Sequence, residues 1–150
     1  MHPSFSAAMM SSLKAIQLLL KIYPDALKVK ANSGKLPLHY ACENYASYQV
    51  IALLLKGSPI AVRAKDDKGL LPLHHACGKI EASTEVIGLL LKKYAKSAKI
   101  KDHRGALPLH YASLYQASHS VIQLLLKSHP GAAKEMGEFK SLPLHCALLD

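Results

Sequence analysis

One tetrapeptide, Leu-Pro-Leu-His, occurs four times in this chain. Its copies begin at residues 36, 71, 107 and 142, so they are separated by 35, 36 and 35 residues. A second run, Ile-x-Leu-Leu-Leu, begins at residues 16, 51, 87 and 122 and keeps the same three spacings. Two different motifs that share one period indicate a chain built of structural repeats. In such an array each unit buries its apolar face against its neighbours, so a linear core replaces a central one.

The composition agrees with such a core and limits the other classes of protein. Half of the 150 residues are hydrophobic, which provides enough apolar surface for a core. The apolar run at residues 50–55 ends at a lysine, whereas a membrane-spanning helix needs about 18 apolar residues or more. The first ten residues lack the basic start and long apolar segment of a secretory signal. We therefore expect an intracellular protein, with the cytoplasm as its compartment.

The three cysteines agree with a reducing compartment. Cys42 and Cys77 occupy the same repeat position, so stacking would hold them about 8–10 Å apart, one helix spacing. A disulfide tolerates a Cα separation of only about 4.4–6.8 Å. Cys146 occupies a different position, and no Cys-x-x-Cys pair exists. We expect free thiols and no structural metal.

Each repeat is expected to contain two helices and an exposed loop. Pro37 suits the first turn of a helix, where its missing N–H costs nothing, and apolar residues at 38, 41 and 42 follow with helical spacing. The apolar residues at 50, 51, 54 and 55 predict a second helix, which ends at a lysine that is soon followed by proline in three copies. The link onward contains Asp-x-x-Gly at residues 66–69 and 102–105. This pattern predicts a β-turn with glycine at a positive φ.

The repeated motif resembles that of ankyrin repeats, whose 33-residue unit opens its first helix with Thr-Pro-Leu-His-x-Ala. Here the matching segments are residues 36–41, 71–76, 107–112 and 142–147. The resemblance implies an all-α solenoid of helix-turn-helix repeats with short, exposed β-turn or hairpin-like loops. We divide residues 1–150 into one array with a partial first repeat at 1–31, full repeats at 32–66, 67–102 and 103–137, and a truncated last repeat at 138–150.

Three departures mark a divergent subtype. Leucine replaces threonine in every copy, so a hydroxyl that could cap the first helix is absent and another group must tie the loop to the helix. The extra residues of the longer period fall at 46–47, 82–83 and 117–118, where ankyrins usually carry a glycine. The chain also stops inside a first helix, whereas solenoids normally end in polar caps. Either the array continues in a longer protein, or another surface covers this end.

The histidine of the motif is interpreted as structural. His39, His74, His110 and His145 occupy one repeated position, so stacking holds them too far apart to share a metal ion, whose ligands lie about 2.0–2.1 Å from it. We expect each imidazole to bond to nearby backbone and tie the loop to the helix, which the resemblance also implies.

The sequence offers no arrangement suited to catalysis. A nucleophile needs a base within hydrogen-bond reach and a third group that orients the base, and the glycines are scattered singly rather than grouped in a phosphate-binding loop. We therefore predict a protein that is not an enzyme, with no catalytic residues, no metal ligands and no cofactors.

The basic residues follow the repeat. Of the 19 lysines and arginines, 11 fall into three columns: Lys21, Lys56, Lys92 and Lys127; Lys28, Arg63, Lys99 and Lys134; and Lys30, Lys65 and Lys101. A basic stripe attracts acidic proteins, anionic lipid or nucleic acid, although lysines at helix ends also serve solubility alone. Aromatic residues do not interleave with these columns, so we expect no specific nucleic-acid readout.

Positions that differ between copies are the better indication of a binding site. The resemblance implies that the loop tips and the exposed part of each first helix line a concave face. The corresponding residues are Asn32, Ser33, Lys35, Glu43, Asn44, Asp67, Lys68, Leu70, Lys79, His103, Arg104, Ala106, Leu114, Tyr115, Glu138, Phe139 and Ser141. Arg104, Tyr115 and Phe139 are the best anchor candidates, since arginine and aromatic residues dominate interface energetics.

Three functions remain open at this stage. We predict a non-catalytic scaffold that binds another protein through this concave face and takes no small-molecule substrate. One alternative is an electrostatic module that docks on an anionic membrane or nucleic acid through the basic columns. The other is the targeting segment of a larger enzyme whose catalytic part lies outside these residues.

Overall fold

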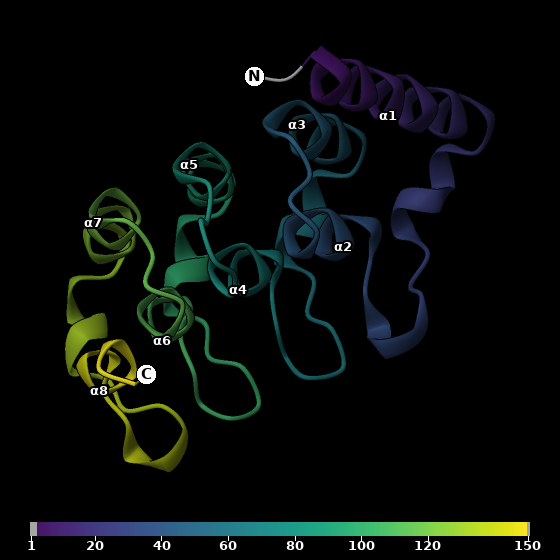
Figure 1. Cartoon of the computed structure of the whole chain (residues 1–150). Coiled ribbons are helices and arrows are strands. Elements are labelled where there is room, and N and C mark those ends of the chain that lie inside the picture. The colour runs from purple at the N-terminus through teal and green to yellow at the C-terminus, as the bar shows by residue number, and fades with distance from the viewer. Residues whose placement is uncertain (1–2, 150) are drawn as a thin grey trace.

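The computed structural model describes residues 3–149, and in this range every regular element is a helix (Figure 1). One row contains the first helices of the repeats, and a second row contains the second helices. The first helices are α2 (Pro37–Glu43), α4 (Pro72–Cys77), α6 (Pro108–Leu114) and α8 (Pro143–Ala147), and the second helices are α1 (Pro3–Ile22), α3 (Tyr48–Gly57), α5 (Thr84–Lys93) and α7 (His119–Ser128). The predicted all-α repeat array is confirmed. The predicted array limits at residues 1 and 150 lie outside the described residues.

The core lies between the two rows. Helices α2, α4 and α6 each pack against the second helix of the same repeat, the first helices of neighbouring repeats pack against one another, and α3, α5 and α7 pack side by side. The predicted apolar face of α3 is buried, as are Ile87 and Leu90 of α5. Because the same positions are buried in successive repeats, the core is continuous along the stack.

A serine begins each of the helices α3, α5 and α7. The Oγ atoms of Ser47, Ser83 and Ser118 accept hydrogen bonds from the backbone N–H groups three residues later, at 3.2–3.3 Å. The residue two positions before each serine has a positive φ of 54–60°. This left-handed residue makes the turn for which ankyrins usually carry a glycine, so the longer inter-helix segment still reverses the chain sharply.

A short 3₁₀ helix follows each second helix. These elements are η1 (Pro24–Lys28), η3 (Pro59–Arg63), η4 (Ala95–Lys99) and η5 (Pro130–Lys134). The sequence predicts only that proline stops the second helix. The added turn directs the chain back toward the first-helix row and buries small residues such as Ala61, Ala98 and Ala132.

Exposed loops, here called fingers, connect each 3₁₀ helix to the next first helix and form a row along one edge of the stack (Figure 1). In the second finger, the Gly69 N–H donates to the Asp66 carbonyl at 3.0 Å. Gly34, Gly69 and Gly105 have φ values of 71°, 79° and 83°, so the predicted β-turn with glycine at a positive φ is confirmed. Single backbone hydrogen bonds join neighbouring fingers, from Asp67 to Ser33 and from His103 to Lys68, each 3.0 Å long.

Candidate binding surface

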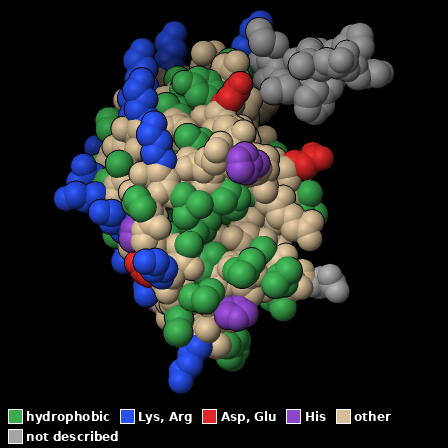
Figure 2. Space-filling view, turned by 90° about the vertical axis from the view of Figure 1, so that its left-hand side faces the viewer, with side chains coloured by type: hydrophobic (Ala, Val, Ile, Leu, Met, Phe, Trp, Pro, Cys, Tyr) green, Lys and Arg blue, Asp and Glu red, His purple; other side chains and the backbone are tan. Residues whose placement is uncertain are grey.

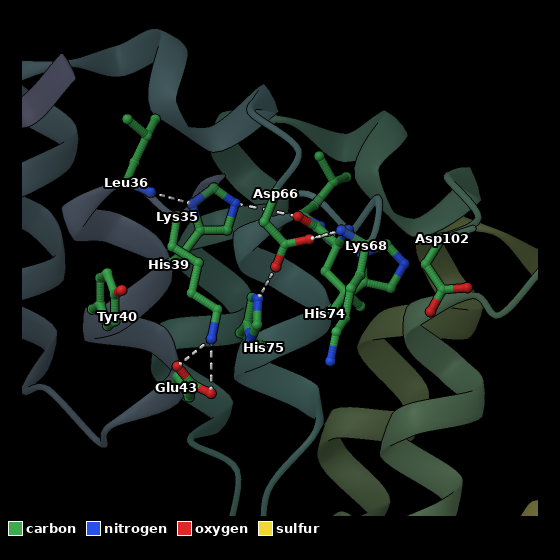
Figure 3. A network of polar contacts seen from close by, with 12 residues as sticks. Lys35, Leu36, His39, Tyr40, Glu43, Asp66, Lys68, His74, His75 and Asp102 are labelled. Atoms are coloured by element: carbon green, nitrogen blue, oxygen red, sulfur yellow. Dashed lines mark hydrogen bonds and ion pairs between the residues drawn. The ribbon is translucent and has the colours of Figure 1, made fainter. Parts of the chain in front are cut away.

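The motif histidines tie each first helix to the finger of the following repeat (Figure 3). His39 Nδ1 accepts a hydrogen bond from the Leu36 N–H at 3.0 Å. Since Nδ1 accepts, the ring proton lies on Nε2, which donates to the carbonyls of Ala64 at 3.0 Å and Leu70 at 3.2 Å. The predicted structural role is confirmed. The structure adds that the ring bonds across a repeat boundary, because Leu70 belongs to the following unit, whereas Ala64 belongs to the unit of His39 itself.

Two further copies repeat this arrangement. His74 Nδ1 accepts from the Leu71 N–H at 2.9 Å, and its Nε2 donates to the Ala106 carbonyl at 3.3 Å. His110 accepts from the Leu107 N–H and donates to two carbonyls of the following loop, at 3.1 Å each. Burial lowers the pKa of His39 and His110 and lowers that of His74 to about 4. The rings are therefore neutral at physiological pH, as this hydrogen-bond pattern requires.

A buried aspartate braces the second finger (Figure 3). Asp66 Oδ1 accepts from the N–H groups of Lys68 and Leu70 at 2.9 Å each, and Oδ2 accepts from His75 Nε2 at 2.8 Å. Burial alone would raise the pKa of Asp66, but the hydrogen bonds from His75, Leu70 and Lys68 outweigh it, so this pKa lies below its usual value. The carboxylate therefore stays ionised and holds the finger closed.

Asp102 braces the third finger in the same way. Its Oδ1 accepts from the N–H groups of Arg104 and Ala106 at 2.9 Å each, and its Oδ2 accepts from the Tyr111 hydroxyl. Burial and this carboxylate raise the pKa of Tyr111. The outer fingers carry Ala31 and Gly137 at this position. Sequence reasoning missed the braces, although Asp-x-x-Gly followed by His or Tyr nine residues after the aspartate is a readable signal.

The predicted partner-binding residues lie on the fingers and around the C-terminal ends of the first helices, and none of them is buried. Several of them also form contacts within the protein, two lysines among them. Lys35 Nζ lies 2.9 Å from a carboxylate oxygen of Glu43. Lys79 is half-buried, donates to the Cys42 carbonyl at 2.7 Å and lies 4.2 Å from the centre of the Tyr45 ring. These lysines therefore hold neighbouring repeats or segments together.

Six of the predicted residues come together around one cavity of about 270 Å³, which lies between the third and fourth fingers and helices α6 and α8. Phe139 is 90% exposed, and Leu114 and Leu149 are also exposed. Arg104 and Glu138 form an ion pair of 3.6 Å beside them. The predicted residues of the lining are Arg104, Ala106, Leu114, Glu138, Phe139 and Ser141, and the residues not predicted are His110, Tyr111, Cys146 and Leu149.

The other predicted residues do not line this cavity. Tyr115 directly follows α6 and is exposed, and His103 lies against Gly69, where an added Cβ would lie 2.5 Å from the imidazole. The remainder lie farther along the row of fingers and first helices: Asn32, Ser33, Lys35, Glu43, Asn44, Asp67, Lys68, Leu70 and Lys79. The C-terminal half of this row is thus the part that contains a defined apolar depression.

The basic columns lie away from this cavity. One column lies at the C-terminal ends of the second helices, the second at the last residue of each 3₁₀ helix that follows, and the third just before the fingers. All 11 side chains are exposed. Among the described residues only Lys28 and Lys101 of these columns form ion pairs, with Asp25 at 4.0 Å and Glu135 at 3.4 Å, and Arg63 lies 4.7 Å from the centre of the Tyr94 ring.

The thiols and the possible metal ligands were considered next. Cys42, Cys77 and Cys146 are free thiols, and burial raises the pKa of Cys42 to about 12, which makes it a poor nucleophile. Within residues 3–149 no three His, Cys, Asp or Glu side chains are grouped as metal ligands. Over the same range, no helix has the length and apolar character required to cross a membrane.

The sequence was compared with models of known protein families and with curated proteins. A family model described as ankyrin repeats, in three copies, matches residues 46–137, which is more than half of the chain. No curated protein matches the sequence.

Proposed function

Because the chain belongs to the ankyrin repeat family, whose members are generally protein–protein interaction modules, we propose that it is a non-catalytic scaffold that binds its partner through the fingers and first helices. The cavity between the third and fourth fingers is the centre of the proposed surface. It gathers apolar and aromatic side chains with an arginine at its edge, which is the composition of interface hot spots.

The backbone of the fourth finger supports this assignment. Phe139 has a φ of 56° and Lys140 has the same value. For a bulky residue this left-handed conformation costs on the order of 1–2 kcal/mol. Backbone strain of this kind gathers at ligand-binding positions, and here it accompanies an almost fully exposed phenyl ring. A polar or small residue would satisfy a turn at lower cost, so we infer that Phe139 is retained for contact with a partner.

The lining also indicates what kind of partner fits. Leu114, Leu149 and Phe139 offer apolar contact, whereas Arg104 and Glu138 already pair with each other. A segment that inserts one bulky apolar side chain would bury these groups without leaving a charge unpaired. We therefore propose a peptide or surface loop with an apolar anchor as the element recognised.

Selection from a displayed random-peptide library tests this proposal. Peptides bound by the wild-type chain are synthesised, and their affinities are measured by calorimetry for Phe139→Ser and Leu114→Ser. We expect each variant to weaken binding at least about tenfold, the cost of about 1.4 kcal/mol at a hot spot. Ile60→Ser is the matched control, because Ile60 is also apolar and exposed, at 71%, but lies on η3. Ligands that bind both concave-face variants as tightly as the wild type would refute the proposed surface.

The basic columns support a second candidate function, docking on an anionic membrane or nucleic acid. The observation that favours it is that 11 exposed cations lie in register while the chain carries a net charge of +9. Binding to vesicles containing anionic lipid and to duplex DNA would be measured across a salt series. A steep loss of affinity with salt supports this function, and a flat or absent response rejects it.

A further inference from the structure

The two ends of the described range, residues 3–149, each contain one half of a repeat. Helix α1 carries the Ile-x-Leu-Leu-Leu motif and occupies the place of a second helix, with no first helix before it in the described residues. Helix α8 carries the Leu-Pro-Leu-His motif and is a first helix, with no second helix after it in the same range. The N-terminal end therefore lacks a first helix, which the C-terminal end has, and the C-terminal end lacks a second helix, which the N-terminal end has.

The N-terminal end exposes framework leucines. Leu19 corresponds to Leu54, Leu90 and Leu125 of the other second helices, which are at most 5% exposed. Leu19 itself is 65% exposed, and Leu18 and Ile22 beside it are also exposed. In the complete repeats this position belongs to the buried core between the two rows of helices. The exposed face of α1 is thus shaped for a first helix.

The C-terminal end shows the opposite half of the same contact. Leu144 corresponds to Leu38, Leu73 and Leu109, which are at most 3% exposed, yet Leu144 is 66% exposed. A groove of about 420 Å³ lies where a second helix would pack, and Leu144 and Ala147 of α8 line it together with Ile122 and Leu126 of α7. Figure 2 shows this end of the stack, with apolar side chains gathered across its middle and lysines along one edge.

His145 provides a hydrogen-bond donor at the C-terminal end. His145 Nδ1 accepts from the Leu142 N–H at 2.9 Å, as in the other copies. Within the described residues, however, its Nε2 has no carbonyl partner, whereas those of His39, His74 and His110 bond to the following loop. By the repeat spacing, the carbonyls that correspond to Ala64 and Leu70 in the first finger are those of Val29 and Lys35.

We propose that a second copy of this chain covers the C-terminal end by head-to-tail stacking. Helix α1 of one molecule packs into the groove of α7 and α8 of another, Leu19 meets Leu144, and His145 Nε2 donates to the carbonyls of Val29 and Lys35. The contact rebuilds a complete repeat at the junction. Terminal repeats that face water carry polar outer surfaces, but both of these faces keep the apolar framework residues. Because the two faces differ, the contact is heterologous and extends into open chains.

Analytical ultracentrifugation of single-end variants tests this arrangement. The wild-type chain is expected to increase in mean mass above 16.3 kDa as its concentration rises. Leu19→Glu blocks one face and Leu144→Glu blocks the other, so each variant alone should remain monomeric. An equal mixture of the two should form one dimer and nothing larger, because each partner contributes its single intact face. Ile60→Glu, a charge-matched change outside both faces, should associate as the wild type does.

Several results would overturn the proposal. A wild-type chain that stays monomeric at every concentration would mean that another occupant covers the end, such as a continuation of the array in a longer protein. Dimers of Leu19→Glu alone would indicate a symmetric contact instead. Unchanged circular dichroism would show that the glutamate variants, placed at exposed positions, are folded. His145→Ala should weaken association about tenfold because its hydrogen bonds are lost. Unchanged association would contradict the proposed pairing of His145 with the carbonyls of Val29 and Lys35.

Discussion

At the scale of single residues, the histidine of each Leu-Pro-Leu-His motif makes the connection that leucine, in the usual threonine position, cannot make. One ring nitrogen accepts from the N–H that begins the helix, and the other donates to a carbonyl of the next repeat, that of Leu70 in the case of His39. Both bonds require the neutral Nε2–H tautomer at a buried position. The packing of one repeat on the next therefore depends on the protonation state of the motif histidines.

His74 makes this link testable by pH. Burial lowers its pKa from 6.5 to about 4. Because the folded-state pKa lies below that of the unfolded chain, the unfolded state binds the proton first as pH falls. Stability is complete above about pH 6.5 and is lost as pH falls toward 4, and at pH 5 the loss from His74 is about 2 kcal/mol. His39 and His110 add to it in the same direction.

Urea unfolding at pH 7.5 and pH 5 measures this loss. The pKa values of Asp66 and Glu135 are lowered, so the stability that these carboxylates contribute is lost only as pH falls below the ordinary carboxylate pKa. The interval between pH 7.5 and pH 5 lies above that range. His74→Gln should show a smaller drop in the free energy of unfolding between the two pH values than the wild type. His119→Gln, at an exposed histidine, should leave the drop unchanged. An equal drop in His74→Gln would exclude His74 as its source.

At the scale of the helices, burial separates framework residues from recognition residues. Leu90 is fully buried in α5, whereas Lys68 is exposed at a finger tip. We expect Leu90→Ala to lower the free energy of unfolding by about 2–5 kcal/mol, because it removes apolar contacts and leaves a cavity. Lys68→Ala should change it by less than about 0.5 kcal/mol. Chemical denaturation compares the two, and equal losses would contradict the division.

The serine caps provide a second test at this scale. Ser83 Oγ accepts from the Val86 N–H, which otherwise has no partner within the first turn of α5. Ser83→Ala should cost about 1 kcal/mol of stability, and Ser83→Asp should retain most of it because aspartate also caps. Thermal unfolding of both variants and of the wild type measures these differences in stability. A loss that aspartate does not reduce would mean that the serine acts by something other than its cap.

The same elements mark what a sequence can and cannot predict. The period, the buried faces of α3 and α5 and the glycine turns followed from residue type and spacing, because local rules decide them. The bond from His39 to Leu70 of the next repeat did not, since it depends on how far one repeat is displaced against the next. The cavity beside Phe139 was predicted in part: its finger residues were named, but Cys146 and Leu149 enter it only because α8 packs against α6.

At the scale of the whole molecule, a stack held by nearest-neighbour contacts should be least stable where neighbours are missing. Five of the six residues of α4 are buried, whereas α8 buries only Pro143 and exposes Leu144. At a concentration low enough to keep the ends free, amide hydrogens of α8 should therefore exchange at least about tenfold faster than those of α4, a difference of about 1.4 kcal/mol in opening free energy.

Hydrogen exchange read by mass spectrometry also separates two accounts of the C-terminal end. If stacking of a second copy covers α8, its protection should rise with protein concentration in the wild type and stay constant in Leu144→Glu, while α4 changes in neither. If the array opens as one unit, α4 and α8 exchange at the same rate at every concentration. That result would contradict the nearest-neighbour description, because the exposed leucines would then not lower the opening free energy of α8 below that of α4.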